Sequence, residues 1–384
     1  MKKIMAALLA AMFLLGLTSC GKDTVSSPGV SSKTESQASS APTESQPQRK
    51  ELKPLTEYPN PDDLPKATVI GKDFAKGSLY NGPVLQYRKA GDKATLGVWW
   101  WSIQNLVQPA DGVSVDQILD CLLMSNVTEI YLCLNGMLPW SEQQAQGGEL
   151  DEGMISEADV RGFVSKCTKL GLRVAALGGS TNWVQESDKG MGLYNFMDKV
   201  NEYQTHAKED EKLYGVHLDV EPHTLDDFEM KRSYYCQLLA NLTADAAEYA
   251  KSMNLLLEWD IYSYFENNDI ISDPVTGQNS TMLDVMFTYC DTVTVMTYYN
   301  NGLAQFERGQ LEAEHAKKHG KKVVLSSETI RISPSSVSYY VPGKAVLVTE
   351  SEVLRKKTEE TGHDKYGFAV HHAVSFYALM MREK

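Results

Sequence analysis

The sequence lacks several features that would assign it to a common class of protein. Its six cysteines form no CxxC pair, which excludes a zinc ribbon and a thioredoxin-type site. Lys and Arg total 37 against 50 Asp and Glu, and this acidic balance argues against nucleic acid or anionic lipid as the main partner. With 42% hydrophobic and 23% charged residues, the chain is too apolar to be disordered and too polar to be a polytopic membrane protein. Its 384 residues allow one large barrel or two to three small domains.

The longest apolar run, from Ile4 to Leu17, has about 14 residues, whereas a membrane-spanning helix needs about 20. Lys2 and Lys3 precede it, and Leu17-Thr18-Ser19-Cys20 ends it. This order resembles a bacterial lipoprotein signal, in which the cysteine is lipidated and the peptide is cut just before it. The resemblance implies a signal peptide over residues 1–19 and a lipid anchor on Cys20. The protein would then lie on the outer face of the cytoplasmic membrane, or in the periplasm or outer membrane of a Gram-negative cell. An uncleaved anchor is the alternative.

Residues 20–65 have the composition of a flexible tether. Between Gly21 and Lys50 there are eight Ser, three Thr, three Pro and three Gln, too little apolar surface to offset the entropy of ordering. The remaining domain, 66–384, would stand off the membrane on this tether. Residues 51–93 do not fit the pattern that follows, and we expect a small N-terminal addition there. The five cysteines after Cys20 lie in apolar periodic segments and are predicted to be buried thiols.

Short apolar runs alternate with amphipathic stretches from about Thr95 onward. They recur about every 39 residues, more than the roughly 30 that a βαβ crossover needs. The expected strands are Leu96–Trp101, Glu129–Leu134, Arg173–Leu177, Gly215–Glu221, Leu255–Asp260, Thr292–Tyr298, Lys322–Ser326 and Gly367–His372. The expected helices are Val115–Met124, Glu157–Leu170, Leu193–Lys208, Asp227–Ser252, Leu303–His319 and Thr349–Glu360. Ser114 and Ser156 are candidate N-caps, and Gly171 and Gly320 follow helices.

Eight βα units predict an α/β fold, a (β/α)8 TIM barrel with a short N-terminal addition. A doubly wound open sheet is the alternative. No GxGxxG or Walker sequence follows the first strand, which weakens a nucleotide-binding version of that alternative, and we expect no cofactor.

The fourth expected strand carries polar residues where a parallel barrel strand should be apolar. Because side chains alternate along a strand, Val216, Leu218 and Val220 share one face, while His217, Asp219 and Glu221 share the other. The polar face is expected to point into the barrel and rise toward the C-terminal ends of the strands, where active sites of this fold lie. A structural ion-pair network, including Arg173, is the alternative. If Asp219 is ionised, it raises the pKa of Glu221, and a protonated Glu is a competent general acid for a glycosidic oxygen.

Three motifs resemble family 18 glycoside hydrolases, the chitinase and endo-N-acetylglucosaminidase group. Asp219-Val220-Glu221 resembles the end of the DGxDxDxE strand, Leu177-Gly178-Gly179-Ser180 the SxGG strand end, and Met296-Thr297-Tyr298 the MxYD motif. The chain departs from the pattern at four places. Tyr214 and His217 stand where the family has Asp, Tyr299 replaces the Asp of MxYD, and His371 and His372 occupy the last strand where a Trp is expected.

The resemblance implies a retaining, substrate-assisted reaction on a glycan that contains N-acetylglucosamine (chitin-like, N-glycan or peptidoglycan). Glu221 would be the acid and then the base, Asp219 would orient the 2-acetamido group, and Tyr298 would donate a hydrogen bond to its oxygen. Glu258 and Asp260 share one face of the fifth strand and could reach the same site. Side chains expected to contact the glycan are His217, Trp101, Trp183, Trp259, Tyr299 and His372.

Three other interpretations stay open. The protein could be a non-catalytic carbohydrate-binding lipoprotein whose glycosidase site has decayed. It could be a two-glutamate retaining glycosidase that uses Glu221 and Glu328, although such enzymes usually carry Asn before the first Glu and this chain has Val220. His217, Asp219, Glu221 and a histidine at the rim could instead bind a divalent metal, but the HxH pair typical of metal-hydrolase barrels is absent from the first strand, and we expect no metal.

Overall fold

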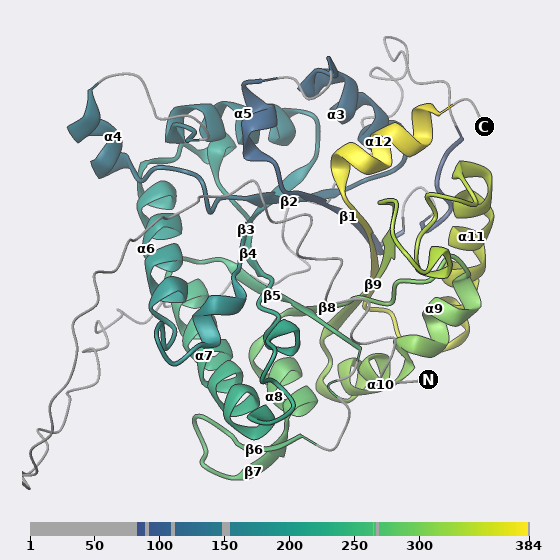
Figure 1. Cartoon of the computed structure of the whole chain (residues 1–384). Coiled ribbons are helices and arrows are strands. Elements are labelled where there is room, and N and C mark those ends of the chain that lie inside the picture. The colour runs from purple at the N-terminus through teal and green to yellow at the C-terminus, as the bar shows by residue number, and fades with distance from the viewer. Residues whose placement is uncertain are drawn as a thin grey trace, which may run out of the picture.

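The computed structural model describes residues 83–88, 92–108, 112–147, 154–263, 265 and 269–382. Eight parallel strands in these ranges close into a barrel in the order β1-β10-β9-β8-β5-β4-β3-β2 (Figure 1). Their bounds are β1 Thr95–Trp100, β2 Glu129–Cys133, β3 Arg173–Gly178, β4 Gly215–Leu218, β5 Leu256–Ile261, β8 Thr292–Val295, β9 Lys322–Glu328 and β10 Tyr366–His371. The expected TIM barrel is confirmed, and each of its eight strands lies within a few residues of its expected place.

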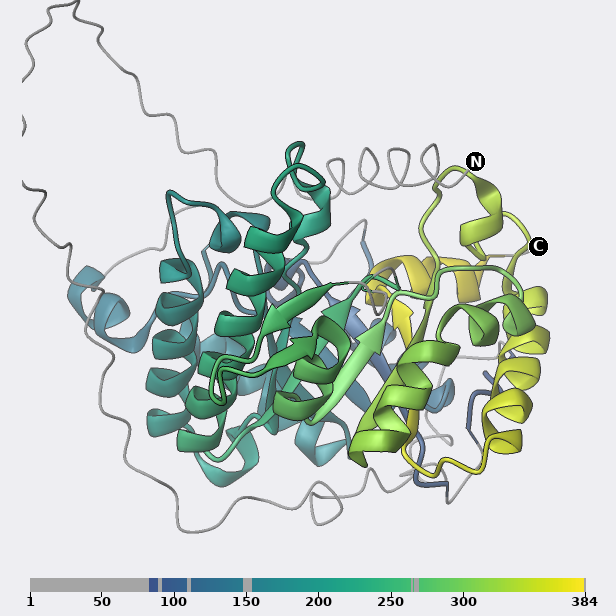
Figure 2. The same ribbon diagram turned by 90° about the horizontal axis from the view of Figure 1, so that it is seen from below.

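Helices surround the barrel on its outer side (Figures 1 and 2). They are α3 Val115–Met124, α4 Trp140–Gln146, α5 Glu157–Lys169, α6 Met191–His206, α7 Arg232–Ser252, α8 Met282–Tyr289, α9 Gly302–Arg308, α10 Gln310–His319, α11 Lys344–Glu360 and α12 Ala373–Met381. Short 3₁₀ helices are η1 Ile103–Leu106, η2 Thr181–Val184, η3 Glu209–Glu211, η4 Pro222–Thr224 and η5 Ser335–Val337. A small antiparallel hairpin, β6 Ile270–Ser272 with β7 Asn279–Thr281, lies outside the barrel.

The expected helix boundaries are set by the residues that predicted them. The Oγ atoms of Ser114 and Ser156 accept backbone N–H groups in the first turns of α3 and α5, each within a capping box. Gly171 and Gly320 follow α5 and α10 with φ of +78° and +64°, a backbone conformation that costs glycine little.

One expected helix is divided in two. The stretch Leu303–His319 forms α9 and α10, which meet at Gly309. A Cβ at Gly309 would lie 2.5 Å from Cδ2 of Leu325 on β9, so the chain approaches the barrel wall too closely there for a side chain. Three helices were not expected from the sequence: α4, α8 and α12.

Residues 83–88, the described part of the expected N-terminal addition, pack against the barrel. Tyr87 is fully buried, its ring stacks on Phe368 of β10 with centroids 5.1 Å apart, and its hydroxyl lies 2.5 Å from Oγ of Ser327 on β9. The backbone N–H of Gln86 donates to Oγ of Ser351 on α11. This segment therefore covers the outer side of β9 and β10.

The expected signal peptide, the lipidated Cys20 and the tether lie outside the described residues. In the part of the chain that is described, no helix is long and apolar enough to cross a membrane. The five cysteines there are buried and form no disulfide, as predicted: Cys121, Cys133, Cys167, Cys236 and Cys290.

Candidate active site

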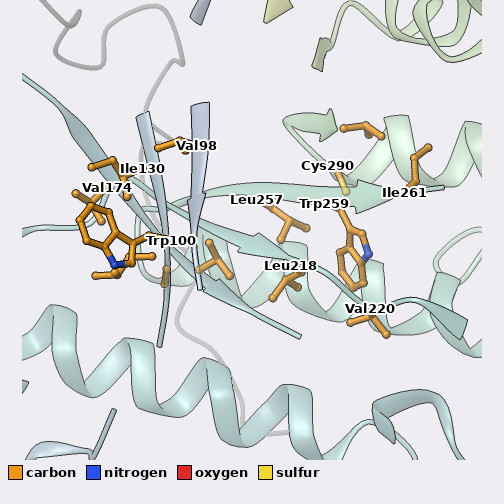
Figure 3. Close-up of a cluster of buried hydrophobic side chains, with 14 of the residues drawn as sticks. Val98, Trp100, Ile130, Val174, Leu218, Val220, Leu257, Trp259, Ile261 and Cys290 are labelled. Carbon is orange, nitrogen blue, oxygen red and sulfur yellow. The ribbon is translucent and has the colours of Figure 1, made fainter. Parts of the chain in front are cut away.

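The two faces of β4 are occupied as the alternation predicts. Leu218 and Val220 are buried against the helices together with Trp259 of β5 (Figure 3), whereas His217 points to the opposite side and bonds to the inward-facing acids of β5. Beyond the strand, the backbone N–H of Asp219 donates to the carbonyl of Gly178, which continues the pairing with β3. A Cβ at Gly179 would lie 1.8 Å from the carbonyl oxygen of Asp219. Glycine at 179 thus lets the two strand ends approach where the carboxylates emerge.

His217 is completely buried and held by two carboxylates. Its Nδ1 lies 3.0 Å from Oε2 of Glu258, and its Nε2 lies 2.7 Å from Oδ1 of Asp260. Burial opposes a charge on the ring, yet Asp260 and Glu258 outweigh it and raise the pKa of His217 to about 9. The ring is therefore an imidazolium at neutral pH that donates from both nitrogens. Its face stacks on Tyr131, with centroids 3.8 Å apart.

Aromatic side chains complete the hydrogen bonding of the two acids on β5. The indole N–H of Trp99 donates to Oδ2 of Asp260 at 2.8 Å, and the hydroxyl of Tyr214 donates to Oε2 of Glu258 at 3.0 Å. The charge of His217, together with these donors, fixes both carboxylates inside the barrel wall. Tyr214 and His217, the two departures from the family 18 strand, thus both bond to acids of the neighbouring strand.

Asp219 and Glu221 differ from the acids of β5, because each has one carboxyl oxygen that lacks such a bond in the described part of the chain. Oδ1 of Asp219 and Oε1 of Glu221 are buried and have no hydrogen-bond partner among the described residues. Burial, and after it the charge of Asp260, raises the pKa of Glu221 to about 8. Burial, Glu221 and Asp260 raise the pKa of Asp219 well above its ordinary value. With a pKa of about 8, Glu221 is largely protonated at neutral pH, as a general acid requires.

Tyr298 follows β8 and lies close to the same acids. Its side chain is buried, and burial, together with the neighbouring carboxyl groups of Glu328, Asp260, Asp219 and Glu221, raises its pKa well above the ordinary value. The phenol therefore stays protonated and can donate a hydrogen bond. The structure brings together the three side chains that the sequence assigned to catalysis: Asp219, Glu221 and Tyr298.

His223, which the sequence reasoning missed, lies beside Glu221. Its Nε2 is 3.6 Å from Oε1 of Glu221, and its ring stacks on Tyr262 with centroids 4.6 Å apart. Burial, and after it the charge of Arg232, lowers the pKa of His223 to about 4, so the imidazole is neutral at neutral pH. The sequence signal was its place in Glu221-Pro222-His223, directly after the strand.

A second chain of polar contacts lies where β1, β9 and β10 end. Oε1 of Glu328 accepts the backbone N–H groups of Thr329 and Ile330, and Oε2 lies 2.9 Å from Nδ1 of His371. The indole N–H of Trp101 donates to Nε2 of His371 at 2.7 Å. These contacts assign the proton of His371 to Nδ1. Trp101 is thereby anchored at its N–H while its side chain stays half-buried.

Three of the expected substrate contacts are corrected by their surroundings. Trp259 is fully buried on the outer face of β5 (Figure 3), because Glu258 and Asp260 occupy the inner face. Trp183 packs against α6, where a Cβ at Gly192 would lie 2.1 Å from its ring. His217 is enclosed by protein and acts on the acids of β5.

The other expected substrate contacts are Trp101, Tyr299 and His372, and all three side chains are partly exposed. His371, which was not among the expected contacts, is the histidine of that pair that joins Glu328 and Trp101. Both nitrogens of His217 bond to the acids of β5, which are not ligands in the metal-hydrolase alternative, and neither bonds to Asp219 or Glu221, which are.

Comparison with known proteins finds similarity only at the level of structure. No protein-family profile and no curated protein matches the chain. A family 18 chitinase from Cycas revoluta in complex with allosamidin is 12% identical, with 75% of this chain and 97% of that chain covered and a TM-score of 0.43. The C-terminal domain of a putative chitinase from Desulfitobacterium hafniense is 14% identical over 62% of this chain and 67% of that chain, with a TM-score of 0.38.

A β-N-acetylhexosaminidase from Bacteroides fragilis is 11% identical over 61% of this chain and 50% of that chain, with a TM-score of 0.35. The matching structures include the family that the three sequence motifs resemble. Identities of 10–14% and TM-scores below 0.5 do not establish membership of that family. The barrel is established by its own strand pairing.

Proposed function

We propose that this protein is a retaining, substrate-assisted glycoside hydrolase that acts on a glycan containing N-acetylglucosamine. One observation carries the proposal: Asp219 and Glu221 emerge side by side from β4, both have raised pKa values, and each has a buried oxygen without a hydrogen-bond partner. Burying two such carboxyls costs free energy that a structural role does not return. A substrate that accepts a proton and hydrogen bonds there accounts for both.

Each group has a defined part in the proposed reaction. Glu221 gives its proton to the glycosidic oxygen as the bond to the anomeric carbon breaks, while the 2-acetamido oxygen of the substrate attacks that carbon. Asp219 orients the acetamide, and the hydroxyl of Tyr298 donates to its oxygen. Water then attacks the same carbon as its bond to the acetamido oxygen breaks, which restores the acetamide; one proton of the water passes to the Glu221 carboxylate, and the anomeric configuration is retained.

The test is hydrolysis of a panel of N-acetylglucosamine glycans, peptidoglycan included, by the wild type and by Glu221→Gln. We expect turnover with retained configuration in the wild type, and a loss of at least about 10³-fold in kcat with glycan binding preserved in the variant. Glu229→Gln is a matched control because Glu229 is 82% exposed and lies outside the barrel interior. Glycan binding without turnover by the wild type on every member of the panel would favour the binding-protein alternative.

The variant Glu328→Gln distinguishes the substrate-assisted mechanism from the two-glutamate alternative. Glu328 accepts two backbone N–H groups and the His371 ring, which uses both of its oxygens and leaves neither oriented as a nucleophile. We expect Glu328→Gln to retain far more activity than Glu221→Gln. Equal losses, combined with cleavage of a plain hexose polymer, would contradict substrate assistance.

We also propose that the enzyme works outside the cytoplasm on a lipid anchor at Cys20. The basic, apolar and small residues of the first twenty positions support this location. Metabolic labelling with a fatty acid should mark the wild type and leave Cys20→Ala unlabelled. Labelling of both would show that any lipid is attached elsewhere.

A further inference from the structure

A group of metal-ligating side chains lies between two outer helices, away from the acids of the barrel interior. His315 and His319 are one turn apart on α10 and therefore face the same side of that helix. Asp284, in the first turn of the adjacent α8, faces them: its Oδ1 lies 3.1 Å from Nδ1 of His315 and 2.9 Å from Nε2 of His319. Within the described part of the chain, this is the group whose three ligand atoms all lie within 4.8 Å of one another.

We propose that Asp284, His315 and His319 bind one divalent transition-metal ion of the zinc class, with water as the fourth ligand. Zinc bonds to imidazole nitrogen and carboxylate oxygen are about 2.0–2.2 Å long, so tetrahedral ligand atoms lie about 3.4 Å apart. The nitrogen–oxygen distances here are shorter by only a few tenths of an ångström. We expect rotation of the three side chains to supply that widening. Two imidazoles and one carboxylate suit zinc, copper or nickel better than calcium or magnesium.

The surroundings orient the carboxylate in the way that ligating carboxylates are oriented. Oδ2 of Asp284 accepts the hydroxyl of Thr281 at 3.0 Å, while the backbone N–H of Asp284 donates to the same Oγ1 at 3.1 Å. The Oδ1 atom is thereby turned toward α10. The ring of His315 also rests on Phe287, with centroids 6.5 Å apart. Asp284 and His319 are partly exposed, with 21% and 20% of their side chains accessible, whereas His315 is nearly buried, so an ion would enter from the side of Asp284 and His319.

Lys318 would compete with the ion for the carboxylate of Asp284. Its ammonium lies 2.8 Å from Oδ1 of Asp284, but its side chain is 62% exposed and can turn into water. Metal binding therefore competes with an exposed ion pair, which contributes little. Removing the ammonium should tighten the metal site. If the cluster were only a structural group of ion pairs, the wild type would not bind the metal, and Lys318→Met would not change that.

The experiment uses the full chain without an affinity tag, stripped with a chelator, and titrates it with Zn²⁺ by calorimetry and with Co²⁺ by absorption spectroscopy. We expect one ion per chain, the intense visible bands of tetrahedral Co²⁺, and a thermal midpoint that rises with Zn²⁺. His315→Gln/His319→Gln should weaken Zn²⁺ binding at least 100-fold. Lys318→Met should strengthen it several-fold. The matched control is His206→Gln, because His206 is a partly exposed histidine on α6. This variant should bind Zn²⁺ with the affinity and stoichiometry of the wild type.

Weak binding of several ions per chain, or binding that survives the double variant, would overturn the proposal. So would a Lys318→Met variant that binds no tighter than the wild type. Because none of these residues is part of the barrel-interior site, the double variant should keep its glycosidase activity. The outcome is thus independent of the proposed function.

Discussion

Replacing Glu221 with Gln should stabilise the protein at alkaline pH. The pKa of this carboxyl rises from 4.5 to about 8 on folding, chiefly because it is buried and then because Asp260 lies near. At about 1.36 kcal/mol per pH unit, that rise corresponds to about 5 kcal/mol in favour of the protonated form. The folded state therefore binds the proton more tightly than the unfolded state, and its stability falls as pH rises from about 4.5 through 8. Glutamine is close in shape and has no proton to lose.

The pKa shift of Glu221 therefore predicts how the stability difference between the wild type and Glu221→Gln depends on pH. At pH 4 the side chain at position 221 is largely neutral in the wild type and always neutral in the variant, so the two free energies of unfolding should be similar. At pH 9 the wild type carries a buried carboxylate, so Glu221→Gln should be more stable by about 2–5 kcal/mol, the upper figure being the full linkage value. Urea unfolding at both pH values measures it. Glu229→Gln, a substitution at an exposed glutamate, is the matched control. A difference that is the same at pH 4 and pH 9 would refute the assignment of a buried, proton-holding carboxyl.

Three further predictions concern the site and its support. Asp260→Asn should move the alkaline limb of kcat/KM to lower pH, because the charge of Asp260 helps to hold the proton on Glu221; a pH–rate profile checks this. Gly179→Ala should cost about 1–3 kcal/mol in urea unfolding and lower kcat, because the new Cβ would meet the carbonyl oxygen of Asp219. Trp259→Phe should lower stability by about 1–2 kcal/mol without changing glycan affinity in calorimetry, because the indole lies on the outer face of the barrel.

The barrel could be predicted from the sequence because its strands and most of its helices carry periodic patterns bounded by caps. The helices that were missed lack that pattern. Five of the eight residues of α8 are buried and the helix has only about two turns, while α12 is apolar almost throughout, so neither carries an extended amphipathic pattern. The short α4 has no buried residue among those that are described and offers no apolar stripe. The secondary structure of such segments is determined by their packing against the rest of the fold, and this packing cannot be derived from the pattern of a single sequence.

The site was predictable wherever strand alternation applies. It placed His217, Asp219 and Glu221 on one face correctly, and it also places Glu258 and Asp260 inward on β5. By the same rule Trp259, which lies between those two acids in the sequence, points away from the barrel interior. The expectation that Trp259 contacts substrate therefore conflicted with the alternation. The orientation of Trp183 and His223 could not be derived in this way, because they lie in η2 and in η4.

The departures from the family 18 strand bear on whether the proposed enzyme is active. Two positions where that pattern has Asp are Tyr214 and His217, yet β5 supplies Glu258 and Asp260 as their partners, so negative charge is still present inside the barrel. Decay of a site removes the selection that keeps buried polar groups paired, and unpaired groups there cost stability. Here both nitrogens of His217 are paired, and Asp219 and Glu221, the two residues assigned to the reaction, each keep one buried carboxyl oxygen without a hydrogen-bond partner among the residues that the structure describes. Neutralising β5 in the variant Glu258→Gln/Asp260→Asn should therefore abolish turnover even though neither side chain is assigned a contact with substrate. Unchanged kcat in that variant would mean that the network is only structural.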